Sequence, residues 1–216
     1  MVPFFTVILP VYNRADLLPR AVASLLQQEE QDWEALIVDD ASTDTTSAIA
    51  QELAAQDERI RYVLRTANGG TAAARNSGIE QARGLFVTFL DSDDEYLPEH
   101  LSSRREMLLS HEEIEFLHGG VAVIGDPWVI DRFDTTQKIH INDCVVGGTF
   151  VIRRDQLSRI GPFREGAYAD DALFFERAEE AGVTIAATDY PTYRYYRNVP
   201  NQQTSVYTTP PAPHGS

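Results

Sequence analysis

Cysteine and lysine are almost absent from this chain of 216 residues, and acidic residues far outnumber basic ones. Cys144 is the single cysteine, which excludes an internal disulfide and fits a reducing compartment. Lys138 is the single lysine, and the formal net charge of −15 argues against nucleic-acid binding and against a polybasic membrane anchor. The other basic residues are arginines, whose planar guanidinium suits phosphate or carboxylate partners.

Long apolar runs are also lacking. No stretch approaches the ~18 residues that indicate a membrane-spanning helix. The N-terminal FFTVILPV follows no basic leader and precedes no small-residue cleavage site, so it is predicted to be a strand and not a signal peptide. We therefore expect a cytoplasmic protein with no transmembrane segment, whose association with a membrane is at most peripheral.

The pattern of apolar residues predicts a regular alternation of strands and helices over the first hundred residues. The predicted strands are 4–11, 33–38, 60–64 and 85–90, and the predicted helices are 15–28, 43–56, 71–83 and 97–110. Such alternation with short connections indicates a parallel sheet with right-handed crossovers. The expected fold is α/β, with a Rossmann-like, mostly parallel sheet flanked by helices.

The pattern becomes mixed in the second half of the chain. Strands are predicted at 114–125, 128–133, 149–154, 183–189 and 192–197, and helices at 154–161 and 170–182. We expect the sheet to continue into a mixed lobe of the same domain. Residues 1–110 would form its first half and 111–199 its second, and the polar, proline-rich segment 200–216 would be a tail or linker.

Polar clusters follow each strand of the first half. They read PVYNR, DDASTD, TANGGTAAARN and DSDD. In open parallel sheets, ligands bind outside the carboxyl ends of the strands, so four clusters on that edge indicate one site. NGG precedes a predicted helix, whose free N-terminal amides are expected to favour an anionic ligand. DSDD offers hard oxygen ligands that suit Mg²⁺ or Mn²⁺ held with a diphosphate, and Arg75 is expected to reach a phosphate oxygen. Asp39 and Asp40 are expected to accept hydrogen bonds from a base or a ribose.

The motifs resemble the nucleotide-sugar half of the family 2 inverting glycosyltransferases, which have the GT-A fold. The matching segments are VILPVYNRADLLPRAVASLLQQ, WEALIVDDASTDTT and NGGTAAARNSGIEQARGLFVTFLDSDDEYLPEHL. Similarity continues in GGTFVIRRDQLSRIGPF and YADDALFFERAEEAG, and covers roughly residues 4 to 197. The resemblance implies transfer of a sugar from a nucleotide diphosphate, with uridine the expected base, to a hydroxyl of a glycan or lipid-linked glycan in surface polysaccharide or glycan synthesis.

The resemblance also implies roles for individual residues. The nucleotide-sugar-binding set is Pro10, Val11, Tyr12, Asn13, Asp39, Asp40, Asn68, Gly69, Arg75, Asp91 and Ser92. Asp93 matches the principal metal ligand of the DxD motif, and Asp91 contacts the ribose or a metal-bound water. Asp171 is the candidate general base and Asp170 its neighbour. Asp94 is expected only to cap the following turn.

Two departures from the family pattern bear on these roles. Asp170 stands where the family usually has Glu, so the choice of base within the pair stays open. The segment YRYYRNVPNQQ holds no His, although some members place a metal or phosphate contact there; Arg194, Tyr196 or Arg197 are alternatives for it.

Other interpretations compete with the enzyme named above. A haloacid dehalogenase-type phosphatase would use Asp91, Asp93, Lys138 and the pair Asp170–Asp171 in that order, but it leaves PVYN and NGGTAAARN without a role. A non-catalytic homologue that binds nucleotide-sugar is the second alternative, because function depends on the site and not on the fold. Each acidic cluster taken singly also fits a solvated turn or a helix cap.

Overall fold

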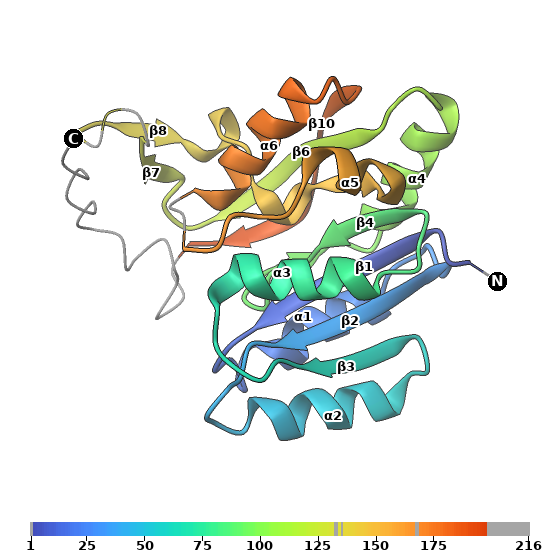
Figure 1. Ribbon diagram of the computed structural model, residues 1–216. Helices are drawn as coiled ribbons and strands as arrows, with labels where there is room; N and C mark the ends of the chain where they lie inside the picture. The colour runs from blue at the N-terminus through green and yellow to red at the C-terminus, as the bar shows by residue number, and fades with distance from the viewer. Residues whose placement is uncertain (1, 132–133, 135, 167–168, 198–216) are drawn as a thin grey trace.

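The computed structural model describes residues 2–131, 134, 136–166 and 169–197 (Figure 1). The strands are β1 (Phe5–Val11), β2 (Trp33–Asp39), β3 (Ile60–Leu64), β4 (Phe86–Phe89), β5 (Glu95–Tyr96), β6 (Phe116–Ile124), β7 (Trp128–Ile130), β8 (Lys138–His140), β9 (Val151–Arg153) and β10 (Ile185–Tyr196). The α-helices are α1 (Leu18–Leu26), α2 (Thr46–Gln56), α3 (Gly70–Gln81), α4 (His100–Ser110), α5 (Leu157–Ile160) and α6 (Asp170–Glu180). Short 3₁₀ turns are η1 (Ile141–Asp143), η2 (Gly147–Thr149) and η3 (Arg154–Gln156).

Within the described residues, eight strands form one sheet in the order β3-β2-β1-β4-β9-β6-β10-β5. Neighbours β3, β2, β1 and β4 are parallel, as are β6 and β10, while β9 and β5 pair in antiparallel fashion. This is the mostly parallel α/β sheet expected from the alternation of strands and helices. Strands of both halves of the chain join one sheet, and the boundary between residues 110 and 111 stays a prediction.

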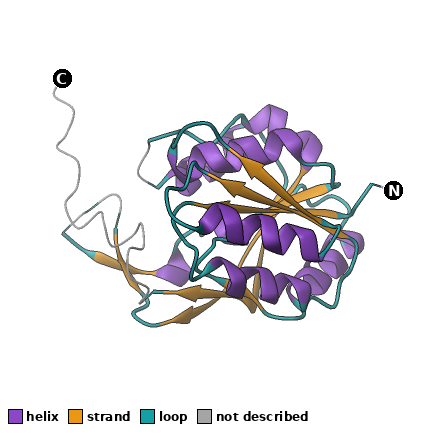
Figure 2. Cartoon of the chain, turned by 90° about the horizontal axis from the view of Figure 1, so that it is seen from below, coloured by secondary structure: helices purple, strands orange, loops and turns teal. Residues whose placement is uncertain are grey.

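Two hydrophobic cores lie on opposite faces of this sheet (Figure 2). Because successive side chains of a strand point to opposite faces, Val7 and Leu9 of β1 enter one core and Ile8 enters the other. The first core takes its helical side chains from α1, α2 and α4, and the second from α3, α5 and α6. The strands in the middle are therefore buried on both faces, which explains why they are continuous apolar runs.

Three local predictions differ from the structure. Segments 183–189 and 192–197 were expected as two strands, but they form the single strand β10, whose pairing with β6 shifts register between Thr188 and Tyr193. The two-residue strand β5 and the strand β8 were not predicted. The hairpin of β7 and β8 follows the carboxyl end of β6 (Figure 1). The segment 200–216 lies outside the described residues.

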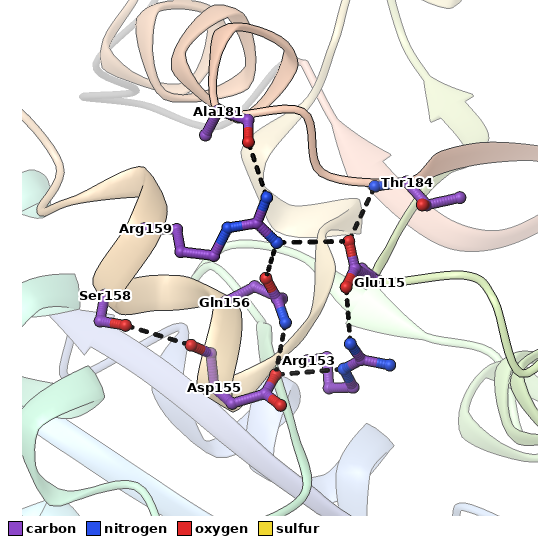
Figure 3. Close-up of polar contacts among 8 residues, drawn as sticks. All are labelled: Glu115, Arg153, Asp155, Gln156, Ser158, Arg159, Ala181 and Thr184. Carbon is purple, nitrogen blue, oxygen red and sulfur yellow. Dashed lines mark hydrogen bonds and ion pairs between the residues drawn. The ribbon is translucent and has the colours of Figure 1, made fainter.

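A polar network lies at the end of the sheet where β4 and β6 begin (Figure 3). Arg153 pairs in register with Phe86, the first residue of β4, and its guanidinium lies 2.6 Å from Glu115. Glu115 also accepts from the backbone N–H of Thr184 at 3.0 Å, and Arg159 donates to the carbonyl of Ala181 at 2.8 Å. The network joins β6, β9, α5 and the turn before β10, far from the carboxyl ends of the parallel strands.

None of the helices in the described part of the chain combines the length and apolar character that crossing a bilayer requires.

Candidate active site

A cleft of about 920 Å³ opens at the carboxyl ends of the parallel strands. Loops after β1, β2, β3 and β4 form one side, and the hairpin of β7 and β8, the turn η1 and the start of α6 form the other. The predicted site residues that line it are Pro10, Val11, Tyr12, Asn13, Asp40, Asn68, Arg75, Asp91, Ser92, Asp93, Asp170 and Asp171. Asp39, which is buried, and Gly69 are not part of the lining. The fold therefore gathers nearly all of the predicted residues around one cavity.

The loops after β1 and β2 support each other. Asn13, with a positive φ of 50°, accepts from the N–H of Thr43 at 2.8 Å and donates its own N–H to Ser42. Asparagine tolerates this left-handed backbone better than most residues do. Tyr12, next to it, is 42% exposed and lines the cleft. Its ring is thus presented on an open wall, where a planar base could stack.

Asp39 and Asp40 are buried and support the loops that follow β2 and β3. Asp39 accepts from the N–H of Ser42 at 2.8 Å and from the hydroxyl of Tyr62 at 2.9 Å. Asp40 forms an ion pair with Arg65 and accepts from the N–H of Gly70 at 2.7 Å. The amides at the start of α3, predicted to favour an anionic ligand, thus donate to a carboxylate of the protein. The contact of either aspartate with a base or ribose stays a prediction.

Strand β10 supports the acidic loop that follows β4, residues 91–94. Asp94 is buried and accepts from the hydroxyl of Tyr193 at 2.7 Å and from the N–H of Tyr196 at 2.9 Å. Burial raises the pKa of Asp94 well above its usual range, and the nearby carboxylates of Asp93 and Asp91 act in the same direction. The expectation that Asp94 only caps the next turn is wrong, because its partners are on β10, about a hundred residues away.

Further contacts extend this support. Arg20 of α1 donates to the carbonyl of Asp93 and lies 3.1 Å from the carboxylate of Glu95. Arg194 and the hydroxyl of Tyr196 also contact Glu95, at 3.3 and 3.0 Å. Arg194 and Tyr196 therefore contact Glu95, the residue directly after the acidic loop. Tyr195 is the β10 tyrosine that lines the cleft.

Arg75 connects the two sides of the cleft. Its side chain is 5% exposed, and its guanidinium lies 3.0 Å from Asp91 and 3.6 Å from Asp170. Burial lowers the pKa of Arg75, but the carboxylates of Asp91, Asp170 and Asp171 outweigh this and raise it. The arginine predicted to reach a phosphate thus has carboxylates as its partners within the chain.

The aspartate pair opens helix α6. Ala169 precedes the helix in a left-handed conformation, with φ of 53°, and turns the pair toward the cleft. Asp171 accepts from the N–H of Gly147 at 3.1 Å. Burial and the charge of Asp170 raise the pKa of Asp171, while Arg75 opposes them. A carboxylate with a raised pKa is the more effective proton acceptor, which fits the role of a general base.

Gly147 is required where these groups meet. A Cβ atom at this position would lie 2.9 Å from the guanidinium of Arg75 and 3.0 Å from the Cβ of Asp171. Only a glycine therefore allows its N–H to reach Asp171 while the arginine stays in place.

The acidic loop after β4 offers two carboxylates to a divalent cation. Asp91 and Asp93 both line the cleft, and no cluster of three His, Cys, Asp or Glu side chains suited to a metal occurs among the described residues. This composition fits Mn²⁺ or Mg²⁺ bound together with a diphosphate, because such ions commonly take one or two carboxylates and complete their shell with phosphate oxygens and water. Asp93 and Asp91 are the residues that would hold the ion.

The residues required by the phosphatase alternative are not brought together. Lys138 lies on β8 with a side chain that is 62% exposed, 3.9 Å from Asp126, and it is absent from the lining of the cleft. Sequence reasoning assigned no role to Arg20 or Gly147, although both lie in segments that match the family, because their partners are distant in the chain.

Comparisons with known proteins agree with this geometry. The family model described as glycosyl transferase family 2 matches residues 6–158. TuaG of Bacillus subtilis, a glycosyltransferase named for teichuronic acid biosynthesis, is 35% identical over 164 residues, which are 73% of this chain and 65% of TuaG. WfgD of Escherichia coli, a UDP-Glc:alpha-D-GlcNAc-diphosphoundecaprenol beta-1,3-glucosyltransferase, is 32% identical over 68% of this chain and 58% of its own length.

Solved structures show the same architecture. The structure of S. aureus TarS with UDP-GlcNAc superposes with a TM-score of 0.77 and 25% identity, covering 93% of this chain and 60% of that chain. A second structure of S. aureus TarS, with UDP, gives a TM-score of 0.75 and 26% identity over 89% of this chain and 60% of that one. The chain thus spans about three fifths of the length of these relatives.

Proposed function

This chain belongs to glycosyl transferase family 2 and has the GT-A fold, and from this premise we propose that it is a metal-dependent, inverting hexosyltransferase. The donor is a nucleotide diphosphate sugar, with UDP as the nucleotide. The acceptor is a hydroxyl of a glycan or lipid-linked glycan in surface polysaccharide synthesis. UDP is favoured because two TarS structures that superpose on nearly the whole chain hold UDP or UDP-GlcNAc.

One observation supports the proposal most directly. Arg75 contacts Asp91 of the acidic loop and Asp170 of the aspartate pair, so the donor residues and the candidate base share one cleft. The diphosphate would lie at the acidic loop, and the acceptor hydroxyl would approach from the side of α6. In this arrangement the base and the leaving group would lie on different sides of the sugar, as a single displacement with inversion requires.

The reaction follows from these positions. Asp171 takes the proton of the acceptor hydroxyl while the acceptor oxygen forms its bond to the anomeric carbon. The bond from that carbon to the diphosphate oxygen breaks, and its electron pair leaves with UDP. A divalent cation, when bound, would neutralise the diphosphate charge and assist its departure. Tyr12 would stack on the base, and the buried Asp39 and Asp40 would hold the donor loops. The reaction would take place on the cytoplasmic side of the membrane.

Calorimetry with UDP and Mn²⁺ tests the donor side. We expect metal-dependent binding by the wild-type chain and at least about tenfold weaker binding after Asp93→Ala, because that change removes a ligand. Metal-dependent binding of equal strength by the variant would remove Asp93 from this role.

Turnover of Asp171→Asn tests the base. We expect UDP binding to persist and sugar transfer to fall by about 10² to 10⁴, the usual contribution of a general base. Asp170→Asn is the matched comparison, since the two residues are adjacent and both line the cleft. Retained transfer by the Asp171 variant, with loss in the Asp170 variant, would reverse the assignment. Loss of UDP binding by the wild-type chain would refute the function as a whole.

A further inference from the structure

The side of the cleft that faces away from the nucleotide loops has a composition of its own. We call it the acceptor wall and define it as the cleft-lining residues of 129–146 and 175–179. Part of it comes from the hairpin of β7 and β8 and part from α6 (Figure 1). Neither element supplies a residue predicted to bind nucleotide, so this wall is free to recognise the second substrate.

Part of the acceptor wall is apolar. Val129 and Ile130 of β7, Ile139 of β8 and Phe175 of α6 are half-buried and line the cleft. Apolar and aromatic side chains of this kind pack against the C–H face of a sugar ring, which carries no charge. Burying the C–H face of an uncharged pyranose against this surface would cost little desolvation, whereas a charged group placed against it would be desolvated without compensation.

Carboxylates surround this apolar surface. Asp143 of η1 and Glu179 of α6 are exposed residues of the wall, and Asp131 and Glu176 also line it. Carboxylate oxygens accept hydrogen bonds from sugar hydroxyls, and they repel an anion. Both properties favour the same class of ligand, a sugar with free hydroxyls and without a negative charge.

The arginines that line the described part of the cleft come from outside the acceptor wall. Among the described residues that line the cleft, the only Lys or Arg side chains are Arg14, in the loop after β1, and Arg75. Arg75 is already surrounded by Asp91, Asp170 and Asp171. The described acceptor wall therefore holds no lysine or arginine that could bind a carboxylate or phosphate of an incoming acceptor.

We propose that the acceptor wall selects an uncharged sugar unit, packed on its apolar surface with its hydroxyls directed to the surrounding carboxylates, and disfavours an acceptor whose reacting unit is a uronate or bears a phosphate. This inference rests on the proposed transferase function and names the class of acceptor for the same cleft. The wall would discriminate between uncharged and anionic acceptors, because its carboxylates repel an anion and its apolar surface desolvates a charged group. The nucleotide loops would not contribute to this preference.

A matched pair of glycosides tests the proposal without knowledge of the linkage formed. Saturation-transfer NMR on the full chain with UDP and Mg²⁺ would measure the dissociation constants of p-nitrophenyl β-D-glucoside and p-nitrophenyl β-D-glucuronide, which differ only at C6. We expect the glucoside to bind at least about tenfold more tightly at low ionic strength. The ratio should shrink as salt is added, because salt screens the repulsion of the glucuronide.

Charge reversal identifies the residues responsible. The double variant Asp143→Lys and Glu179→Lys should reduce the ratio at least about threefold and leave UDP binding unchanged. Glu180→Lys is the matched control, since Glu180 is the exposed neighbour of Glu179 on α6 and does not line the cleft. Equal binding of the two glycosides, no binding of the glucoside, or a ratio that the double variant leaves unchanged would overturn the proposal. Failure of UDP to bind would instead refute the transferase function, so the two failures are distinguishable.

Discussion

Replacing Tyr193 with Phe should weaken both the fold and the donor site, because one hydroxyl connects β10 with the acidic loop. The hydroxyl donates to the buried carboxylate of Asp94 at 2.7 Å and accepts from the N–H of Asp91 at 3.3 Å. The ring has no exposed surface, and a Cβ on Gly148 would lie 2.2 Å from the hydroxyl oxygen, so the site fits this side chain closely.

The magnitude follows from the two bonds. A hydrogen bond between uncharged groups contributes about 1 kcal/mol, and burial favours the uncharged form of Asp94, so Tyr193→Phe should lower the free energy of unfolding by about 2 kcal/mol. For a domain of this size, that loss corresponds to a fall in Tm of about 4–8 °C. Since the N–H of Asp91 also loses its acceptor, UDP should bind more weakly in the presence of Mn²⁺ at temperatures where the variant is still folded.

Chemical denaturation and calorimetry with UDP are the measurements. Tyr190→Phe makes the same change on the same strand, at a ring that is 52% exposed, and it should alter the free energy of unfolding by less than about 0.5 kcal/mol. The explanation would be refuted if Tyr193→Phe behaved like Tyr190→Phe, or if it lost stability while its affinity for UDP stayed that of the wild-type chain.

Other parts of the structure lead to further predictions. Glu115→Ala should lower the free energy of unfolding by about 2 kcal/mol, because it removes the contacts with Arg153 and with the N–H of Thr184. Its kcat should stay unchanged, because the network lies far from the cleft. A changed kcat would contradict this, as would an equal loss of stability in Glu113→Ala, whose side chain is 69% exposed. Burial and the charge of Arg104 lower the pKa of His100 well below its usual value, so unfolding takes up a proton below about pH 6.5. The free energy of unfolding should therefore decrease on acidification below that pH, by up to about 1.4 kcal/mol per pH unit. Denaturation between pH 7.5 and 5.5 should show a smaller dependence of this free energy on pH for His100→Gln than for the wild-type chain. Because the pKa of Asp171 is raised by burial and by Asp170, kcat/KM should fall on acidification with a midpoint above the usual value of about 4 for aspartate, and a midpoint below that value would argue against Asp171 as the base. Removal of divalent cations with EDTA should weaken UDP binding at least about tenfold and added Mn²⁺ should restore it, whereas binding unaffected by EDTA would exclude the metal-dependent mechanism.

The strands and helices could be predicted because their signals are local. Apolar runs and helical spacing are read over a few residues, and the resulting parallel sheet dictates that the loops after β1 to β4 meet at one edge. That rule predicts that Asp40, Asp91 and Asp93 meet in one cleft, and all three line it. The strands β5 and β8 escaped prediction because two or three residues carry no usable periodicity, and their extended form depends on partners elsewhere in the chain.

The partners of charged residues could not be predicted for a related reason. A sequence shows which side chains are charged, but it does not show which pairs the fold brings into contact. Arg75 was expected to reach a phosphate and instead lies between Asp91 and Asp170, 16 and 95 positions further along the chain. Likewise, the amides at the start of α3 were expected to favour an anionic ligand, and they donate to Asp40. Such ion pairs and hydrogen bonds between distant parts of the chain determine the net charge that the site presents to a substrate.

The position of Arg75 has a consequence for how the two substrates are handled. A buried arginine keeps its charge at any physiological pH, so it can hold two groups of carboxylates in place before a donor binds. Asp91, on the donor side, and Asp170, beside the candidate base, share this one cation. A cation bound at Asp91 and Asp93 would compete with Arg75 for Asp91 and leave the arginine more strongly associated with the aspartate pair. Because the charge of Arg75 lowers the pKa of Asp171, the proposed binding of donor and cation would alter the basicity of the candidate base. Proton acceptance would then depend on whether the donor is bound.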